Sequence, residues 1–303
     1  MLPRRTAKFE EYAACAGPYC EPWRTALGVL LIAGIYLIGA AGLTYGAITI
    51  AERIQLGAGY AIVIELATYS SKRAVLIALF SIVLVLPAMW LVLKFLHRRS
   101  VRSLIAPTGR VHWRNYRRAL VFVAVFGLVT SIPVLLGSEL AQQLSVSQWL
   151  PWLLPALLLI FLQTATEELF FRGYLMQQLA AHFHSRWIWW VLPAVLFGAM
   201  HYNPGIYGEN TWLVMASAGL AGLIFGDVTA RSGDLSIAMG LHFANNLTAV
   251  LIIGVPGQMS SLSLYLQRLN VRDIDAMRAE LLVSTGIILA VYLVYLLVLR
   301  ARR

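Results

Sequence analysis

Long apolar runs separated by short polar segments dominate the pattern of this chain. A helix that crosses a bilayer core about 30 Å thick needs about 20 mainly apolar residues. Eight segments fit this pattern and predict membrane-spanning helices over residues 26–51, 74–96, 119–137, 149–179, 187–202, 212–230, 235–255 and 281–299. The fourth segment is too long for one straight span unless it tilts or extends beyond the bilayer.

The composition excludes the other common classes of protein. Of 303 residues, 59% are hydrophobic and only 13% are charged, about half the charged share of an ordinary soluble domain. Disordered chains are poor in apolar residues, and two cysteines are too few for a disulfide-rich scaffold. We therefore expect an all-α polytopic membrane protein with about eight transmembrane helices. A cytoplasmic tail over 1–25 would precede a single transmembrane domain over 26–303.

The distribution of positive charge predicts the orientation in the membrane. Residues 94–118 contain eight Lys and Arg and no acid, which is typical of a cytoplasmic loop. Alternation of the spans then puts 17 Lys and Arg on the cytoplasmic side and six on the other. We expect both termini in the cytoplasm and the protein in a bacterial inner membrane, in contact with membrane lipids. Because this loop resembles no groove-reading or base-stacking module, no nucleic-acid partner is expected.

Few ionisable residues lie within the predicted spans, and each is costly enough there to be a functional candidate. The fourth span contains Glu167, Glu168 and Arg172, the fifth contains His201, and the seventh contains His242 followed by Asn246. The remaining histidines lie in loops or near helix ends, where we expect them to be solvated: His97, His112, His182 and His184.

The depths of these groups decide whether they can meet. Counted from the cytoplasmic end of each span, Glu167 and His201 both lie about 20 Å deep. His242 lies about 10 Å deep and Asn246 about 16 Å. His242 and Asn246 are four residues apart and share one helix face. Three helices therefore carry polar groups at similar depths in the membrane, and a tilt of the helices could bring these groups to the same level.

The two adjacent acids are expected to have different neighbours. Glu168 and Arg172 are four residues apart and can pair, whereas Glu167 points about 100° away from Glu168 around the helix. The two acids therefore need not share a partner. A structural ion pair and interhelical hydrogen bonds are the simplest interpretation of each group alone. Together, the groups indicate a catalytic site or the relay of a proton- or ion-coupled transporter.

Three motifs resemble those of a known family. The runs are Glu167-Glu168-x-x-x-Arg172, Phe197-x-x-x-His201 and His242-x-x-x-Asn246. They look like the motifs of the CPBP family, the CAAX-prenyl-protease and bacteriocin-processing intramembrane endopeptidases related to type II CAAX prenyl endopeptidases. The similarity covers about 149–255. It implies eight helices around a polar cavity open to the cytoplasm, and hydrolysis of a peptide bond near or within the membrane.

The resemblance implies that Glu167, His201, His242 and Asn246 are catalytic. Peptide hydrolysis needs a base for water, and Glu167 suits that role, with His201 helping to hold the water. His242 and Asn246 can donate hydrogen bonds to the developing oxyanion. Arg172 would orient Glu168, which places both in a supporting role. The substrate would be a peptide or a membrane-associated protein.

The motif residues are compatible with either a zinc-dependent or a metal-independent mechanism. Glu167, His201 and His242 could form a two-histidine, one-glutamate zinc site, which would make the protein a zinc-dependent intramembrane protease. However, the chain has no His-Glu-x-x-His motif, and Asn246 is a better oxyanion donor than zinc ligand. We therefore favour glutamate chemistry without a cofactor. Two alternatives to a protease make predictions of their own. A transporter should contain an inverted repeat, and a catalytically inactive membrane scaffold of the same family should have at least one damaged motif. The sequence shows neither feature.

Overall fold

The computed structural model describes residues 5–136, 140–270 and 273–301, without the side chains of 128, 130–136 and 299–301. Its first half contains α1 (Ala7–Ala14), α2 (Pro22–Ile54), α3 (Ala58–Thr68), α4 (Lys72–Val83), α5 (Val85–Phe95), the 3-10 helix η1 (Val101–Leu104), α6 (Trp113–Leu136) and β1 (Leu140–Gln142). Its second half contains α7 (Val146–Glu168), η2 (Leu169–Leu175), α8 (Met176–His182), η3 (Trp187–Val191), α9 (Leu192–Ala199), α10 (Pro204–Tyr207), η4 (Gly208–Asn210), α11 (Thr211–Ser232), α12 (Ser236–Leu247), η5 (Thr248–Ile252), β2 (Ile253–Gly254), η6 (Ser260–Leu262), β3 (Tyr265–Gln267) and α13 (Ile274–Ala301).

Every predicted span corresponds to a helical segment, but the count of eight membrane crossings is not confirmed. Within the described residues, five helices are long and apolar enough to cross a membrane: Pro22–Ile54, Lys72–Phe95, Val146–His182, Pro204–Ser232 and Ile274–Val298. The fifth and seventh predicted spans form shorter apolar helices, Trp187–Ala199 and Ser236–Ile252. The third corresponds to α6, whose predicted end at Gly137 lies outside the described residues. The chain is an all-α integral membrane protein.

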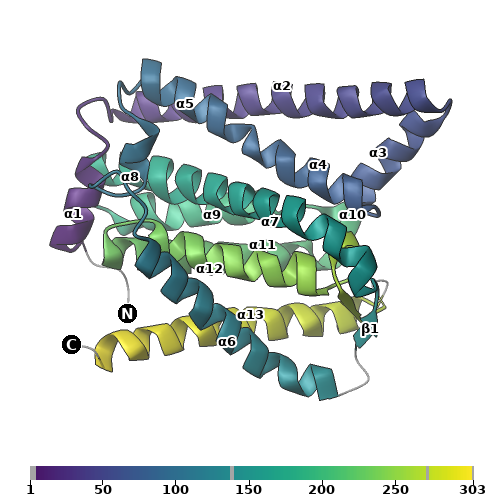
Figure 1. Cartoon of the computed structure of the whole chain (residues 1–303). Helices are drawn as coiled ribbons and strands as arrows, with labels where there is room; N and C mark the ends of the chain where they lie inside the picture. The colour runs from purple at the N-terminus through teal and green to yellow at the C-terminus, as the bar shows by residue number, and fades with distance from the viewer. Residues whose placement is uncertain (1–4, 137–139, 271–272, 302–303) are drawn as a thin grey trace.

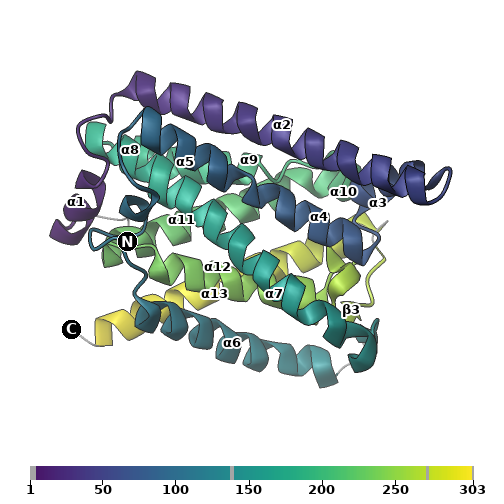
Figure 2. The same ribbon diagram turned by 45° about the horizontal axis from the view of Figure 1, so that its top comes forward.

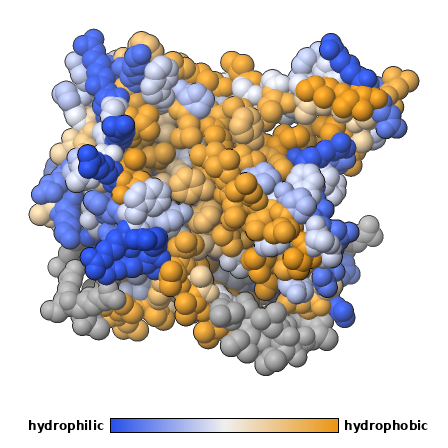
Figure 3. All heavy atoms as spheres, in the orientation of Figure 1, coloured by the Kyte–Doolittle hydropathy of each residue, from blue (hydrophilic) through white to orange (hydrophobic). Residues whose placement is uncertain are grey.

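The long helices run roughly side by side, and the connecting loops and short elements gather at the two ends of the molecule (Figures 1 and 2). Figure 3 shows apolar side chains over the middle of one face, with polar side chains gathered toward both ends. Helix α1, the end of α13 and the basic loop before α6 all lie at the left end in Figure 1. Exposed tryptophans mark this end at the starts of α2, α6 and η3 and on α5: Trp23, Trp113, Trp187 and Trp90. Such aromatic side chains are enriched at membrane–water interfaces.

The opposite end contains structure that the apolar runs do not predict. Helix α3 folds back between α2 and α4 (Figure 1). A three-stranded sheet has the order β1-β3-β2, in which β3 pairs antiparallel to β1 and parallel to β2. The short strands join the segment before α7 to the segment after η5, and thereby tie together the ends of two helices that carry sequence motifs.

The expected N-terminal tail contains a helix that packs into the protein core. Phe9 and Tyr12 of α1 are fully buried. The ring centroid of Phe9 lies 4.5 Å from that of Trp189. The Tyr12 hydroxyl donates to the carbonyls of Leu104, at 2.8 Å, and Arg172, at 3.0 Å. Burial raises the pKa of the Tyr12 phenol, so the hydroxyl stays protonated and keeps donating. Helix α1 therefore contacts the backbone of the segment that carries Arg172.

Helices α9 and α11 approach each other through glycines. A Cβ atom on Gly198 would lie 2.5 Å from the Met215 carbonyl oxygen, and one on Gly222 would lie 3.0 Å from the Cα atom of Ala194. Small residues allow this close packing of helix backbones within a membrane. The packing fixes the helix that precedes His201 against α11, which in turn contacts α12.

Candidate active site

Three helices carry the motif residues, and each includes a π-helical segment. Glu167 and Glu168 are the last residues of α7, and Arg172 lies in the π-helix η2 that continues it. The π-helix η3 precedes α9, and η5 follows α12. Wider π turns are uncommon and occur frequently at functional sites. His242 and Asn246 lie on α12, whereas His201 lies in the turn just after α9.

One oxygen of Glu168 contacts both Arg172 and His242. Arg172 Nη1 donates to Glu168 Oε1 at 2.9 Å, and His242 Nδ1 lies 2.8 Å from the same oxygen. Glu168 is 0% exposed, and Arg172 and His242 are also buried. The Glu168–Arg172 pair expected from the sequence is thus present. With Nδ1 donating to Glu168, the ring orientation of His242 is fixed and Nε2 faces the other acid.

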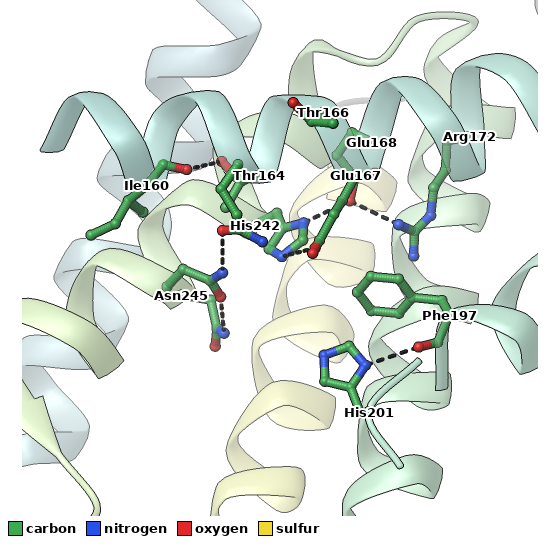
Figure 4. A network of polar contacts seen from close by, with 12 residues as sticks. Ile160, Thr164, Thr166, Glu167, Glu168, Arg172, Phe197, His201, His242 and Asn245 are labelled. Carbon is green, nitrogen blue, oxygen red and sulfur yellow. Dashed lines mark hydrogen bonds and ion pairs between the residues drawn. The ribbon is translucent and has the colours of Figure 1, made fainter. Parts of the chain in front are cut away.

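Glu167 lies on the opposite side of the same imidazole. Its Oε2 atom is 3.4 Å from His242 Nε2, so the two adjacent glutamates share His242 (Figure 4). The sequence suggested that the acids need not share a partner. In the structure the two acids do share a partner, because the imidazole ring of His242 offers Nδ1 to Glu168 and Nε2 to Glu167. The Glu167 side chain is 17% exposed, which leaves this carboxylate accessible while Glu168 is enclosed.

Aromatic rings enclose the buried part of the site. The Phe225 ring stacks on His242 with centroids 5.1 Å apart, and the Phe197 ring meets His242 edge-on at 5.9 Å. The Arg172 guanidinium lies 4.6 Å from the Phe197 ring centroid and 5.2 Å from that of Phe225. Cation–π contacts of this kind are stronger where water is excluded. The aromatic surroundings therefore hold Arg172 and His242 in place and keep water from Glu168.

His201 lies next to the cluster but makes its hydrogen bond within its own segment. Its Nδ1 donates to the Phe197 carbonyl at 2.9 Å, and its ring centroid is 5.0 Å from that of Phe197. In the neutral ring, this bond leaves a lone pair on Nε2. Figure 4 shows Nε2 on the side of the ring that faces Glu167 and His242. The His201 side chain can therefore accept a hydrogen bond from a water molecule between these groups.

Asn246 belongs to a chain of amides that joins α12 to α7. Its Nδ2 donates to Gln163 Oε1 at 3.0 Å, and its Oδ1 accepts from Asn245 Nδ2 at 3.2 Å. Asn246 is partly buried and Gln163 is buried. These contacts fix the orientation of the Asn246 amide and occupy only one of its two N–H donors. The arrangement allows both a bridge between helices and a donor to a ligand.

The alternative zinc site is not assembled by these side chains. Glu167 and His242 approach each other, but no ion-pair contact joins His201 to Glu167 within the part of the chain that the structure describes. Among the described residues, no three His, Cys, Asp or Glu side chains converge as a set of metal ligands. The geometry therefore does not match the three-ligand set, and we derive no step through a metal.

Sequence reasoning missed or misjudged three buried polar residues, of which Gln163 contacts the site residue Asn246. Gln163 could have been found as a polar residue one helical turn before Glu167 in an apolar run. Asp227 lies buried in the sixth predicted span, where it pairs with Arg231 and accepts from the Tyr292 hydroxyl at 2.6 Å. The prediction for His97 was wrong, because its side chain is buried and bonded to the Tyr174 hydroxyl at 2.8 Å.

Comparisons with known proteins relate part of the chain to a known family. Residues 148–248 match the family described as type II CAAX prenyl endopeptidase Rce1-like. The chain is 31% identical over 178 residues to the uncharacterized protein YyaK of Bacillus subtilis (strain 168), which covers 55% of this chain and 57% of YyaK. The match thus spans little more than half the length of this curated relative. No solved structure matches the chain. The matched region contains Glu167, His201, His242 and Asn246, so the part of the chain over residues 148–248 is similar to the Rce1-like type II CAAX prenyl endopeptidase domain.

Proposed function

We propose that this chain is an intramembrane endopeptidase in which Glu167 activates water to hydrolyse a peptide bond of a membrane-associated peptide or protein. The contrast between the two adjacent acids carries the proposal. Glu168 is buried against Arg172 and His242, whereas Glu167 keeps an accessible carboxylate at the same imidazole. The family match of residues 148–248 supports a protease at the level of the reaction class.

In this mechanism, Glu167 takes a proton from water as the water oxygen attacks the carbonyl carbon of the scissile peptide. The Nε2 lone pair of His201 accepts the second hydrogen bond of that water. Glu167 then passes its proton to the leaving nitrogen as the C–N bond breaks, which releases an amine and a new carboxylic acid and returns Glu167 to its ionised form. Supporting this assignment, the Nδ1 bond of His201 to the Phe197 carbonyl leaves its Nε2 free to accept.

The oxyanion of the tetrahedral intermediate would accept hydrogen bonds from His242 Nε2 and Asn246 Nδ2. Donation from His242 requires a protonated imidazole, because Nδ1 already donates to Glu168. A protonated His242 and Arg172 would balance the negative charges of the two glutamates. Buried charges need such pairing, because a charge without a partner is strongly destabilising away from water. Glu168 and Arg172 thus act as positioning residues for His242 and do not touch substrate.

We further propose that the chemistry is independent of metal and that both termini face the cytoplasm of a bacterial inner membrane. The incomplete set of metal ligands supports the first proposal. The 17-to-six distribution of Lys and Arg supports the second. In addition, α1 and the end of α13 lie at the same end of the molecule as the basic loop (Figure 1).

Comparative proteomics tests the proposed activity. Membranes that contain wild-type protein or Glu167→Gln at equal abundance would be analysed for protein termini. We expect new termini in a few membrane-associated proteins with wild type, and the corresponding uncleaved proteins with Glu167→Gln. Identical sets of termini in both membranes would contradict the proposal. Glu11→Gln, which changes an exposed acid of α1, controls for the loss of one negative charge.

A further inference from the structure

A cavity of about 530 Å³ lies between the start of α6, α12 and the end of α13. It is separate from the candidate active site, with which it shares no lining residue. One part of its wall is basic and the rest is mainly apolar. The lining residues that matter here are Arg114, Arg117, Arg118, Phe122, Tyr295 and Val298.

The three arginines form a local excess of positive charge. All are exposed, and none has an acidic partner among the described residues. By contrast, Arg172 is paired with Glu168 and Arg231 with Asp227. No carboxylate side chain lines the cavity. Guanidinium groups bind phosphate through paired N–H donors, so this wall is complementary to a phosphate-bearing anion.

The apolar wall favours a lipid over a free anion. Phe122, Tyr295 and Val298 come from two long helices, α6 and α13, and a free phosphate would leave them uncovered. The exposed Trp113 lies just before Arg114 and marks the level of the membrane interface. A hydrophilic patch lies in Figure 3 where α6 begins in Figure 1. The cavity therefore has its basic part at headgroup level and its apolar part toward the acyl chains.

We propose that this cavity binds one anionic phospholipid. The arginines hold the headgroup phosphate, and an acyl chain lies along Phe122, Tyr295 and Val298. Basic pockets between membrane helices on the cytoplasmic side bind headgroups in this way. The bound lipid adds a further link between α6 and α13, two helices that already contact each other. This binding site is independent of the proposed peptide hydrolysis.

Native mass spectrometry of the full-length protein in detergent tests the basic wall. Phosphatidylglycerol and phosphatidylcholine with identical acyl chains would be titrated separately. We expect one saturable phosphatidylglycerol adduct and much weaker phosphatidylcholine binding. The double variant Arg114→Gln/Arg118→Gln should lose about tenfold or more in affinity, because two charged hydrogen-bond donors are removed. The matched double variant Arg102→Gln/Arg110→Gln removes equal charge from the same basic segment outside the cavity, and should bind as wild type does.

Equal losses in the two double variants would indicate diffuse attraction to a basic surface and would overturn the proposal. Equal binding of both lipids would do the same.

A second variant tests the apolar wall without changing charge. Val121→Trp places a large ring in the cavity from an exposed position on α6. We expect it to abolish the phosphatidylglycerol adduct while the thermal unfolding temperature in detergent stays unchanged. Inorganic phosphate at the same concentration should not displace the lipid. Efficient displacement by phosphate, or normal lipid binding by Val121→Trp, would show that no acyl chain occupies the cavity.

Discussion

His242 and Arg172 are held by a single atom, Oε1 of Glu168, at distances of 2.8 and 2.9 Å. One buried carboxylate thereby links α12 to η2 and orients the imidazole toward Glu167. The Arg172 guanidinium also stacks near Phe197 and Phe225. The arrangement depends on the negative charge of Glu168, because no other carboxylate is as close to Arg172 among the described residues.

Glu168→Gln should therefore destabilise the fold. Removing one partner of a buried ion pair leaves an uncompensated charge and costs about 3–5 kcal/mol. We expect a clearly lower thermal unfolding temperature in detergent, together with reduced cleavage. The double variant Glu168→Gln/Arg172→Met removes both charges and should recover much of the stability but not the activity. Wild-type stability of the single variant would show that the pair does not support the fold.

Much of the helical framework could be predicted from apolar runs, because a bilayer imposes a minimum length on each span. The contacts that position the site residues could not be predicted in this way. The sharing of His242 by Glu167 and Glu168 depends on the position of α12 relative to α7. Helical periodicity describes one helix at a time and carries no such information. The pairing of Asn246 with Gln163 was inaccessible for the same reason.

The same limit applies to the N-terminal segment and to the short elements. Residues 1–25 have too few apolar residues to predict a membrane helix, yet the aromatic rings of Phe9 and Tyr12 fill a space in the core. Helix α3 has 11 residues, which is too short for the length criterion of a span. The strands of two and three residues depend on neighbours that are distant in sequence. Tertiary contacts decide each of these elements.

Tyr12→Phe tests whether α1 supports the motif-bearing helix. The variant leaves the carbonyls of Leu104 and Arg172 without the Tyr12 donor, and a buried group without its partner costs about 1–3 kcal/mol. We expect a lower unfolding temperature. Tyr19→Phe is the matched control, because its hydroxyl makes only an exposed 3.3 Å contact with Arg98. Similar unfolding temperatures for the two variants would mean that the buried hydroxyl contributes nothing.

Asn246→Ala should lower turnover far more than stability. Loss of one oxyanion donor costs about a hundred- to thousandfold in kcat, and KM should change little, because the donor acts mainly in the transition state. Gln163→Ala removes the same interhelical hydrogen bond but leaves Asn246 in place. It should cost only about 0.6 kcal/mol of stability. If both variants show the same small defect in steady-state kinetics, Asn246 serves only as a bridge between helices.

Prolonged chelation should leave the cleavage rate unchanged at neutral pH. This expectation follows from the ligand set, because Glu167, His201 and His242 do not converge as metal ligands among the described residues. The measurement is the rate constant of purified protein before and after dialysis against a chelator, with metal content determined in parallel. Stoichiometric zinc that is lost and restored together with activity would replace the glutamate mechanism by a metal-dependent one.

The rate of peptide cleavage by purified Glu167→Gln tests the central claim most directly. Glutamine keeps the size and hydrogen bonding of Glu167 but removes the base, so we predict that cleavage falls by about a hundredfold or more. Because Glu167 is partly exposed and its contact with His242 is 3.4 Å long, the unfolding temperature should stay close to that of wild type. A folded Glu167→Gln protein that cleaves at the wild-type rate would contradict the assignment of Glu167 as the catalytic base.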